Sequence, residues 1–359
     1  MNILVVCDYK INPNRIGGMD RFFKLFDESV KSDGHQITWI FADVIRHSFY
    51  KDVTMFSAEN NGVLQFTEDY LKNSATKVDV LITHFVTQYS AHFKRFKKIH
   101  QIKKIFCVDH NPRPLNGFPL KKRIKKRIKG ILYHSYIDKV IGVSEYTSKH
   151  SIKDFGTLTA KKTKTIYNGI DPTVFKNKKI RNRTGPIINF IVVSHLRHSK
   201  GIQDLLIALD NLSEIDKKKL SVTVFGSGPY EETLKNICKQ YKLENIVNFK
   251  GSSPDIHLNL FQYDYMLQPT HMECFSLSIL ESLLSNVPVI TTRVGGNAEV
   301  IVSGKNGWLF EATDVEKLTE IIENIISRKN SIKNDIYKEI EEKYSLELMV
   351  ENHIKLLEN

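Results

Sequence analysis

The sequence predicts an α/β protein with two domains, each built on a parallel sheet that is covered by helices. Short apolar runs alternate with helical patterns along most of the 359 residues, and such βα alternation is typical of parallel sheets. The length is large for one α/β domain and comfortable for two. A basic, polar segment that ends in Gly185-Pro186 separates two series of βα units, as expected for a linker between domains.

The N-terminal series contains five apolar runs with strand character. A helix is expected from Asp20 onward, because four apolar side chains between Phe22 and Val30 fall on one face. Further helical patterns separate the later runs, so the strands are expected to lie parallel. The predicted strands are residues 1–7, 36–42, 79–83, 104–108 and 139–143.

The C-terminal series repeats this pattern and ends in helices. From Asp314 the pattern is helical to the end, with a break expected near Asn330. The predicted strands are residues 187–194, 222–225, 263–267 and 288–291, with another strand ending at Gly251 and a tight hairpin over residues 304–310. We therefore expect an N-terminal domain (residues 1–178), a linker (179–186), a C-terminal domain (187–335) and a C-terminal helix (336–359).

Two glutamates, Glu273 and Glu281, lie where a buried strand turns into a helix. Apolar residues at i, i+3 and i+7 predict that the helix begins after Phe275. A buried carboxylate needs hydrogen-bond donors, which sugar hydroxyls supply, and the free amides of a helix start suit a phosphate. Ser278 and Glu281 also have the spacing of a capping box, in which Glu281 would bond only backbone amides.

This segment and its flanks resemble the donor-binding half of retaining glycosyltransferase family 4, of the bacterial surface-glycan type. The resemblance rests on Glu-x7-Glu and on the segments Asn286–Ile290, Gly295–Glu299 and Asn306–Gly307. It implies the GT-B fold, with two Rossmann-like domains facing across a cleft and a C-terminal helix that crosses back to the N-terminal domain. The N-terminal domain would bind the acceptor and the C-terminal domain a nucleotide sugar.

The resemblance also implies roles for the two glutamates and for a basic turn. Glu273 would hold the hydroxyls of the sugar, and Glu281 those of the ribose. The turn after residues 187–194 carries cations where a helix begins, which suits a diphosphate, and Lys200 matches the family lysine. His195 occupies the position of the family arginine and Arg197 lies two residues later, so either side chain is a candidate for that role.

Other candidates for the donor site lie in glycine turns and strand ends. Gly17 and Gly18 follow the first strand and precede a helix, an arrangement that brings amides close to a phosphate. The family has a matching glycine pair near the diphosphate. The resemblance further places six residues near the nucleotide, namely Gly226, Gly228, Lys250, Phe275, Ser276 and Leu277.

His110 follows the predicted strand 104–108, at the end where parallel sheets bind ligands. A lone histidine in such a loop is most often bonded to its neighbours. The family carries a histidine here beside the donor sugar, which makes His110 a candidate sugar contact without implying that it is a base. The predicted catalytic residues are therefore Glu273, His110, Lys200 and Arg197.

The positive charge is concentrated in the N-terminal half. Residues 1–180 contain 32 Lys and Arg against 16 Asp and Glu, whereas the remainder has 20 against 24. Lys121–Lys129 holds seven cations in nine residues, and apolar residues recur every fourth position from Leu120 to Leu132. Such a basic amphipathic helix suits an anionic membrane surface, although an ordinary helix packed by its apolar stripe has the same pattern. Without interleaved aromatics or a binding motif, nucleic acid is not an expected partner.

Several classes of protein and site are excluded or not expected. No apolar run approaches the ~20 residues of a membrane span. The four cysteines are far apart and look like buried thiols in a reducing cytosol. No Asp-x-Asp motif is present, so we expect neither metal nor cofactor, with cations and amides holding a UDP-linked donor.

The expected function is transfer of a hexosyl or N-acetylhexosaminyl group to a lipid-linked or cell-envelope glycan acceptor, in polysaccharide, lipopolysaccharide or capsule assembly. The expected location is the cytoplasm, with peripheral attachment to the inner face of the membrane. Two alternatives are another GT-B-like enzyme, such as an epimerase or phosphorylase, and a non-catalytic, membrane-associated protein that binds nucleotide sugars. A phosphorylase would need a pyridoxal-phosphate lysine in the second domain, which no segment suggests.

Overall fold

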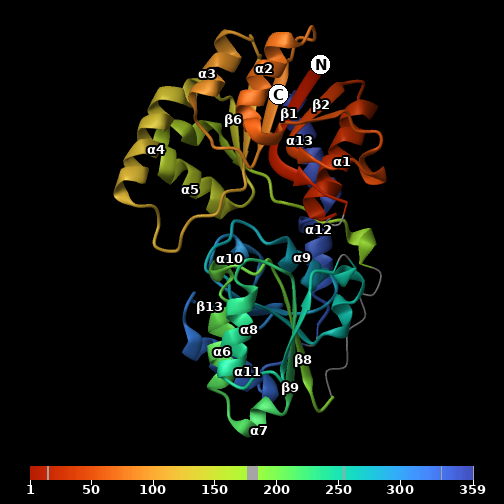
Figure 1. The fold of residues 1–359 in the computed structure, drawn as a ribbon, viewed down its shortest axis with the longest axis vertical. Helices are drawn as coiled ribbons and strands as arrows, with labels where there is room; N and C mark the ends of the chain where they lie inside the picture. Colours follow the sequence, from red (N-terminus) through yellow and green to blue (C-terminus); the bar gives the residue numbers. More distant parts are fainter. Residues whose placement is uncertain (14–15, 176–184, 254, 333, 359) are drawn as a thin grey trace. The chain divides into compact units, whose positions relative to one another are not determined.

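A computed structural model describes the chain except for residues 14–15, 176–184, 254, 333 and 359. It consists of two compact units (Figure 1). The N-terminal unit comprises residues 1–111, 117–169 and 346–359, and the C-terminal unit comprises residues 112–116 and 170–345. Most of the predicted linker, residues 179–184, lies outside the described residues.

The sheet of the N-terminal unit has strand order β3-β2-β1-β4-β5-β6-β7, and the described pairs are all parallel. Its strands are β1 (Asn2–Ile11), β2 (Gln36–Val44), β3 (Met55–Ser57), β4 (Val80–His84), β5 (Lys104–Asp109), β6 (Lys139–Gly142) and β7 (Thr163–Thr165). The five predicted strands are confirmed. The edge strands β3 and β7 were not predicted, because three residues are too few to show a period.

Helices cover both faces of this sheet, so its central strands are buried on each side, as is usual for parallel sheets. They are α1 (Gly18–Ser32), α2 (Val63–Asn73), α3 (Ala91–Lys98), α4 (Leu120–Tyr133), α5 (Glu145–Phe155) and α13 (Leu346–Glu358), with 3-10 turns η1 (Ser48–Tyr50), η2 (Glu59–Asn61), η3 (His134–Tyr136) and η4 (Thr157–Lys162). The predicted aromatic face of α1 is buried. The terminal helix α13 belongs to this unit and packs on α1.

The C-terminal unit has a second parallel sheet, with order β10-β9-β8-β11-β12-β13. Its strands are β8 (Ile188–Val193), β9 (Leu220–Phe225), β10 (Val247–Gly251), β11 (Tyr265–Gln268), β12 (Val289–Thr292) and β13 (Gly307–Phe310). Its helices are α6 (Ile202–Asp210), α7 (Glu214–Lys217), α8 (Glu231–Gln240), α9 (Leu277–Leu284), α10 (Asn297–Val300), α11 (Val315–Ile326) and α12 (Tyr337–Lys343), with 3-10 turns η5 (Pro172–Val174), η6 (His198–Lys200), η7 (Ile256–Leu258) and η8 (Leu260–Gln262).

The hairpin predicted over residues 304–310 is wrong. The Oδ1 atom of Asn306 accepts a hydrogen bond from the amide of Val302 at 2.8 Å, which closes a turn around Gly304. The chain leaves this turn as β13, which pairs in parallel with β12 from Gly307 to Phe310. The glycines that suggested a hairpin therefore form a turn that leads into the edge strand of the sheet.

The helical segment 336–359 is divided between the two units. Helix α12 belongs to the C-terminal unit, where Ile340 is buried and the ring of Tyr344 lies 5.5 Å from that of Phe275. The chain is extended at Ser345, which bridges to Ile170. Only α13 returns to the N-terminal unit, so the returning helix begins at Leu346 and not at residue 336.

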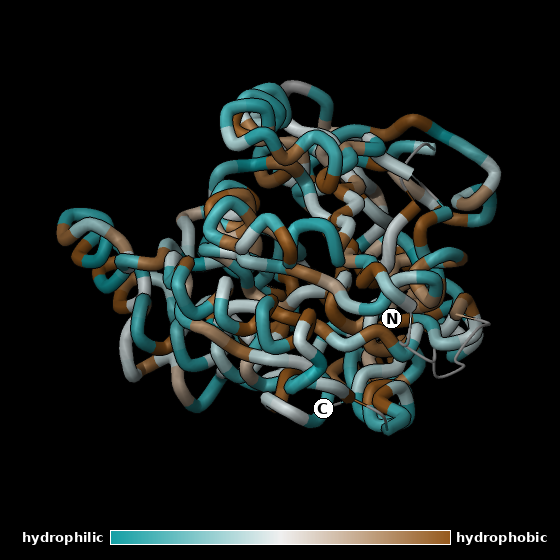
Figure 2. Tube along the Cα trace, turned by 90° about the horizontal axis from the view of Figure 1, so that it is seen from below, coloured by the Kyte–Doolittle hydropathy of each residue, from teal (hydrophilic) through white to brown (hydrophobic). Residues whose placement is uncertain are grey.

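Helix α4 presents its apolar stripe to solvent. Ile124 is 51% and Ile128 50% exposed, and Leu120, Ile131 and Leu132 are exposed as well. The helix packs instead through Gly130, where an added Cβ would lie 1.8 Å from the carbonyl oxygen of Phe155. In Figure 2, α4 is the helix at the left edge and carries both hydrophobic and hydrophilic residues. The alternative interpretation, in which an ordinary helix buries its apolar stripe against the protein, is therefore wrong for α4.

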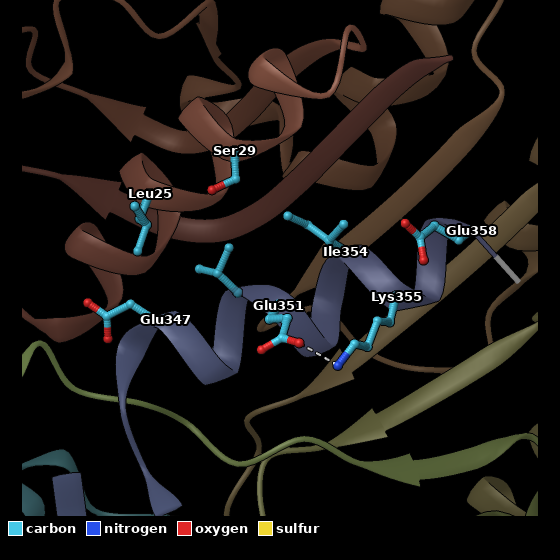
Figure 3. Close-up of a pocket in the computed structure, with 8 residues that line it drawn as sticks. Leu25, Ser29, Glu347, Glu351, Ile354, Lys355 and Glu358 are labelled. Carbon is cyan, nitrogen blue, oxygen red and sulfur yellow. Dashed lines mark hydrogen bonds and ion pairs between the residues drawn. The ribbon is translucent and has the colours of Figure 1, made fainter. Parts of the chain in front are cut away.

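A groove of about 340 Å³ runs between α1 and α13 within the N-terminal unit (Figure 3). Apolar side chains of both helices meet charged side chains of α13 along it. The lining residues are Leu25, Ser29, Glu347, Val350, Glu351, Ile354, Lys355 and Glu358. No residue predicted to bind the donor is among them, so the groove is not the predicted site.

Candidate active site

Lys200 and Glu273 form an ion pair in the C-terminal unit. The Nζ atom of Lys200 donates to Oε2 of Glu273 at 2.8 Å, and the side chains are 23% and 14% exposed. The other carboxylate oxygen, Oε1, accepts from the amide of Cys274 at 3.0 Å. Both oxygens of Glu273 are thus engaged, one by the ammonium group of Lys200 and one by a backbone amide.

The two loops that carry this pair are bonded directly to each other. The amide of His271 donates to the carbonyl of Ser199 at 2.8 Å, and Nε2 of His271 lies 2.5 Å from Oδ2 of Asp204 on α6. Gly201 has φ +69°, and a Cβ atom there would lie 1.8 Å from the carbonyl oxygen of Pro269. Glycine is therefore required at 201 both by its conformation and by this close approach.

The Gly295-Gly296 turn supports the backbone of Glu273. Gly295 has φ +64°, and a Cβ atom there would lie 2.4 Å from the carbonyl oxygen of Glu273. The amide of Gly296 donates to the carbonyl of Cys274 at 2.9 Å. This part of the predicted motif thus acts on the glutamate through the backbone.

Helix α9 begins immediately after Ser276. Ser276 is its N-cap residue, and Oγ of Ser276 accepts from Nε2 of Gln268 at 2.7 Å. Ser278 lies within the helix, so the alternative capping box that starts at Ser278 is wrong. Phe275 is only 3% exposed and its ring lies against that of Tyr344, so the ring belongs to the packing of this unit. Glu281 follows one turn into α9, half-buried.

His195 and Arg197 are both exposed, while Leu196 between them is buried in the core. The guanidinium of Arg197 makes no hydrogen bond or ion pair with the residues that the structure describes. Lys200 is linked to this turn through its amide, which donates to the carbonyl of Arg197 at 2.9 Å. The turn that follows β8 thus carries the three predicted candidates His195, Arg197 and Lys200.

The predicted glycine turn after β9 lies beside the same segment. Leu196 donates its amide to the carbonyl of Ser227 at 3.0 Å, and Gly226 donates its amide to the carbonyl of Gly251 at 2.9 Å. Gly226 and Gly228 are therefore next to the turn of Lys200, and Lys250 is exposed at the end of β10. The predicted donor residues of this unit gather at the carboxyl ends of β8, β9, β10 and β11, where open parallel sheets bind ligands.

In the N-terminal unit, the glycine pair precedes α1 as predicted. The amide of Gly17, however, donates to Oδ2 of Asp20 at 2.8 Å. Asp20 is buried and also accepts from the hydroxyls of Tyr9 and Tyr50, each at 2.8 Å. Burial, with the neighbouring Asp20 carboxylate, raises the pKa of Tyr50. The Gly17 amide thus has a carboxylate acceptor in this structure, whereas Gly18 opens the helix. A role of the glycine pair toward a phosphate stays a prediction.

His110 lies at the carboxyl end of β5 and is 6% exposed. Its ring stacks on that of Phe85 with centroids 4.1 Å apart, and its Nε2 atom lies 3.0 Å from Nδ1 of His84. Burial, with His353 nearby, lowers the pKa of His110 to about 3. Sequence reasoning missed His84, although its position at the end of a predicted strand was the same signal that singled out His110.

The candidates thus form one group in each unit: Gly17, Gly18 and His110 in the N-terminal unit, and the others in the C-terminal unit. Among the described residues, no group of three or more His, Cys, Asp or Glu side chains is arranged to hold a metal ion. No helix formed by these residues has the length and apolarity needed to span a bilayer.

Both units match glycosyltransferase families. Residues 16–174 match the family model described as Glycosyltransferase Family 4, and residues 174–343 match the model described as Glycosyl transferases group 1. The chain therefore carries two glycosyltransferase domains, one in each unit.

Individual proteins agree with this assignment. N-acetyl-alpha-D-glucosaminyl L-malate synthase of Bacillus anthracis is 34% identical over 161 residues, which cover 43% of this glycosyltransferase and 42% of that protein. The chain aligns with about two fifths of the length of this and other curated relatives.

Solved structures establish the fold. Anabaena HepE in complex with UDP-glucose superposes with a TM-score of 0.76 at 20% identity, covering 100% of this chain and 99% of that one. The apo lipopolysaccharide outer core galactosyltransferase WaaB gives a TM-score of 0.73 at 16% identity, with 99% of each chain covered. With its two parallel-sheet units, the glycosyltransferase has the GT-B fold predicted from the sequence.

Proposed function

We propose that this glycosyltransferase moves a sugar from a UDP-linked donor to a lipid-linked or cell-envelope glycan acceptor, with retention of anomeric configuration. The observation that carries the proposal is the ion pair of Lys200 and Glu273 beside the start of α9. Two structural neighbours support it, since HepE was crystallised with UDP-glucose and WaaB is a galactosyltransferase of the lipopolysaccharide outer core.

The chemistry follows from where charge develops. When the bond between the anomeric carbon and the diphosphate oxygen breaks, negative charge grows on the leaving diphosphate. A catalyst gains most by holding positive groups in place before that charge appears. Lys200, Arg197 and the first amides of α9 supply such groups, while Glu273 accepts hydrogen bonds from the sugar and Glu281 from the ribose. With these cations, departure of the diphosphate needs no metal ion.

Transfer assays with labelled UDP-sugars test the proposal directly. Release of UDP that depends on added membrane extract, together with label in an extractable glycan, is the expected result. Sugar isomerisation without any acceptor would instead indicate an epimerase. Saturable binding without turnover would indicate a nucleotide-sugar-binding protein. The anomeric configuration of the product, read by NMR, decides between retention and inversion.

We further propose that α4 attaches the enzyme to the anionic inner face of the cell membrane. Five exposed apolar side chains of α4 accompany seven cations, a combination that suits insertion at the level of the headgroups. Lys126 does not belong to the membrane-facing set, because its Nζ atom bonds Asp154 at 2.8 Å and lies 4.0 Å from the ring of Phe118. An acceptor with a lipid carrier would then be reached at the same surface.

A further inference from the structure

Three buried histidines lie together in the N-terminal unit. His84 ends β4, His110 follows β5 and His353 belongs to α13, with exposures of 0%, 6% and 2%. The rings of His84 and His353 stack with centroids 6.2 Å apart. Only the pair of His84 and His110 is joined by a hydrogen bond, between Nδ1 and Nε2 at 3.0 Å.

The proton on His353 can be assigned from its partner. Nδ1 of His353 lies 2.8 Å from the backbone carbonyl of Met349. A carbonyl only accepts, so Nδ1 carries the proton. Burial lowers the pKa of His353 to about 4, which leaves the ring neutral and makes Nε2 a lone pair. His353 therefore donates no proton to the ring of His84.

The proton between His84 and His110 follows from the far side of His84. Nε2 of His84 is buried and has no hydrogen-bond partner among the described residues. A buried N–H without an acceptor is rarer than a buried lone pair without a donor. The tautomer of His84 that avoids an unpaired N–H carries its proton on Nδ1 and donates it to Nε2 of His110.

His110 must then carry its own proton on Nδ1. Burial lowers the pKa values of both His84 and His110, so each ring has a single proton at neutral pH. Aromatic rings hold the two imidazoles in place: Phe22 lies 5.7 Å from His84, and Phe85 stacks on His110 at 4.1 Å. The bond from His84 thus fixes both the orientation and the tautomer of His110.

We propose that His84 is a positioning residue that keeps His110 in the Nδ1–H tautomer, so that His110 donates a hydrogen bond to an oxygen of the donor sugar and does not act as a base. The role toward the sugar rests on the function proposed above. The tautomer itself does not, because it follows from the hydrogen bonds of the N-terminal unit alone.

Nitrogen-15 NMR of histidine-labelled full-length protein tests the tautomer. We expect the wild-type spectrum to show a protonated Nδ1 and an unprotonated Nε2 for His110, assigned by comparison with His110→Asn. A protonated Nε2 on His110 would overturn the proposal. In His84→Leu the Nε2 atom of His110 loses its donor, so we expect its nitrogen shifts to move toward a mixture of tautomers.

A pair of variants tests the role in transfer. Asparagine can place a side-chain N–H near the position of histidine Nδ1, whereas leucine cannot donate. We expect His84→Leu to lower kcat about five- to tenfold, the effect of one lost hydrogen bond, with KM for the UDP-sugar changed less than about twofold. His84→Asn should keep most of kcat. Equal kcat in wild type and His84→Leu would overturn the positioning role.

Failure of the proposed function would look different. Wild-type protein that transfers no sugar from any UDP-sugar would overturn the transferase assignment, while the nitrogen shifts of His110 would still decide the tautomer. If His84→Leu does not fold, the wild-type spectrum and His84→Asn decide between the two tautomers.

Discussion

The ammonium group of Lys200 and the carboxylate of Glu273 lie 2.8 Å apart, although 73 residues separate them in the chain. Each comes from a loop at the carboxyl end of a strand, and the loops are bonded to each other through Ser199 and His271. The pair is largely shielded from water, so removing one partner leaves the other charge poorly compensated. Kinetic effects of single substitutions at this pair must therefore be measured on protein whose stability is known.

Glu273→Ala is expected to lower kcat by about a hundredfold or more, because in the proposed mechanism it removes an acceptor that holds the sugar in the transition state. The affinity for the UDP-sugar should change less than about threefold, since the carboxylate does not hold the nucleotide. Stopped-time transfer assays and calorimetric titration measure the two quantities. Glu311→Ala is the matched control, because Glu311 is an exposed glutamate of the same unit. Unchanged kcat in Glu273→Ala would remove this residue from the site.

Removal of metal ions is expected to leave transfer intact. In the proposed mechanism, Lys200 and Arg197 provide the positive charge that a divalent cation would otherwise bring to the diphosphate. We expect kcat within about twofold of its original value after dialysis against EDTA, with Lys200→Ala losing most activity whether or not Mg²⁺ is added. Activity that disappears in EDTA and returns with Mg²⁺ or Mn²⁺ would refute a metal-free departure of UDP.

Helix α4 should bind anionic vesicles through two separable contributions. Replacing Lys121, Lys122 and Lys125 by Gln should weaken binding strongly at low salt and little at high salt, because salt screens the attraction between the lysines and the anionic headgroups. Ile124→Ser with Ile128→Ser should weaken binding at every salt concentration, because both side chains are exposed and apolar. Vesicle flotation at several salt concentrations measures both effects.

The control for α4 uses three lysines of the C-terminal unit, Lys218, Lys239 and Lys242. Replacing these by Gln removes the same charge from the protein without touching α4. Binding that falls equally in the control would show a response to net charge and not to a docking surface. Binding that persists in all variants would leave α4 as scaffold.

Gly201→Ala should destabilise the C-terminal unit by about 2–4 kcal/mol, from backbone strain together with the clash against the carbonyl of Pro269. Gly304→Ala is its control, because Gly304 has φ +81° but open space around the added Cβ. That substitution should cost only about 1–2 kcal/mol. Both free energies of unfolding are measured by urea titration in a Trp39→Phe background, where the fluorescence of Trp308 reports on this unit alone. Equal costs would mean that the loops do not need their close contact.

Most of the fold could be predicted because the central strands are buried on both faces. Runs such as Ile3–Cys7 and Phe190–Val192 are continuous, apolar and buried, so the sequence of each run is enough to predict a central strand. The short edge strands and the turn before β13 were missed or misinterpreted. Their course depends on pairing with a neighbour, as when β13 joins β12, and a single segment of sequence does not contain that information.

Site residues could be predicted where a single loop contains a recognisable motif. Residues were missed where their hydrogen-bond partners come from elements that are distant in the sequence. Lys200 and Glu273 were singled out separately by position and resemblance, and the structure joins them. His84 and Asp20 were missed because their roles depend on His110, Tyr9 and Tyr50, which lie elsewhere in the sequence. A buried polar residue has meaning only once its partners are known.

Acid should destabilise the N-terminal unit well before most carboxylates titrate. Burial lowers the pKa of His110 to about 3 and that of His353 to about 4, and it lowers the pKa of His84 well below its usual value. In the unfolded chain these groups titrate near pH ~6.5, so the unfolded state binds more protons as the pH falls below that value. Stability is therefore complete above pH ~6.5 and is lost progressively toward pH ~4, by up to about 1.4 kcal/mol per pH unit for each histidine.

Trp39 provides the measurement, because it is buried in the N-terminal unit and Trp308 is the other of the two tryptophans. In a Trp308→Phe background, the urea midpoint reported by Trp39 should be flat from pH 8 to 7 and should fall between pH 6.5 and 5. His353→Gln cannot take up a proton, so its midpoint should fall less steeply, by the equivalent of about one proton. A midpoint that stays constant from pH 7 to 5, or a slope that His353→Gln leaves unchanged, would show that these histidines are not held neutral by burial.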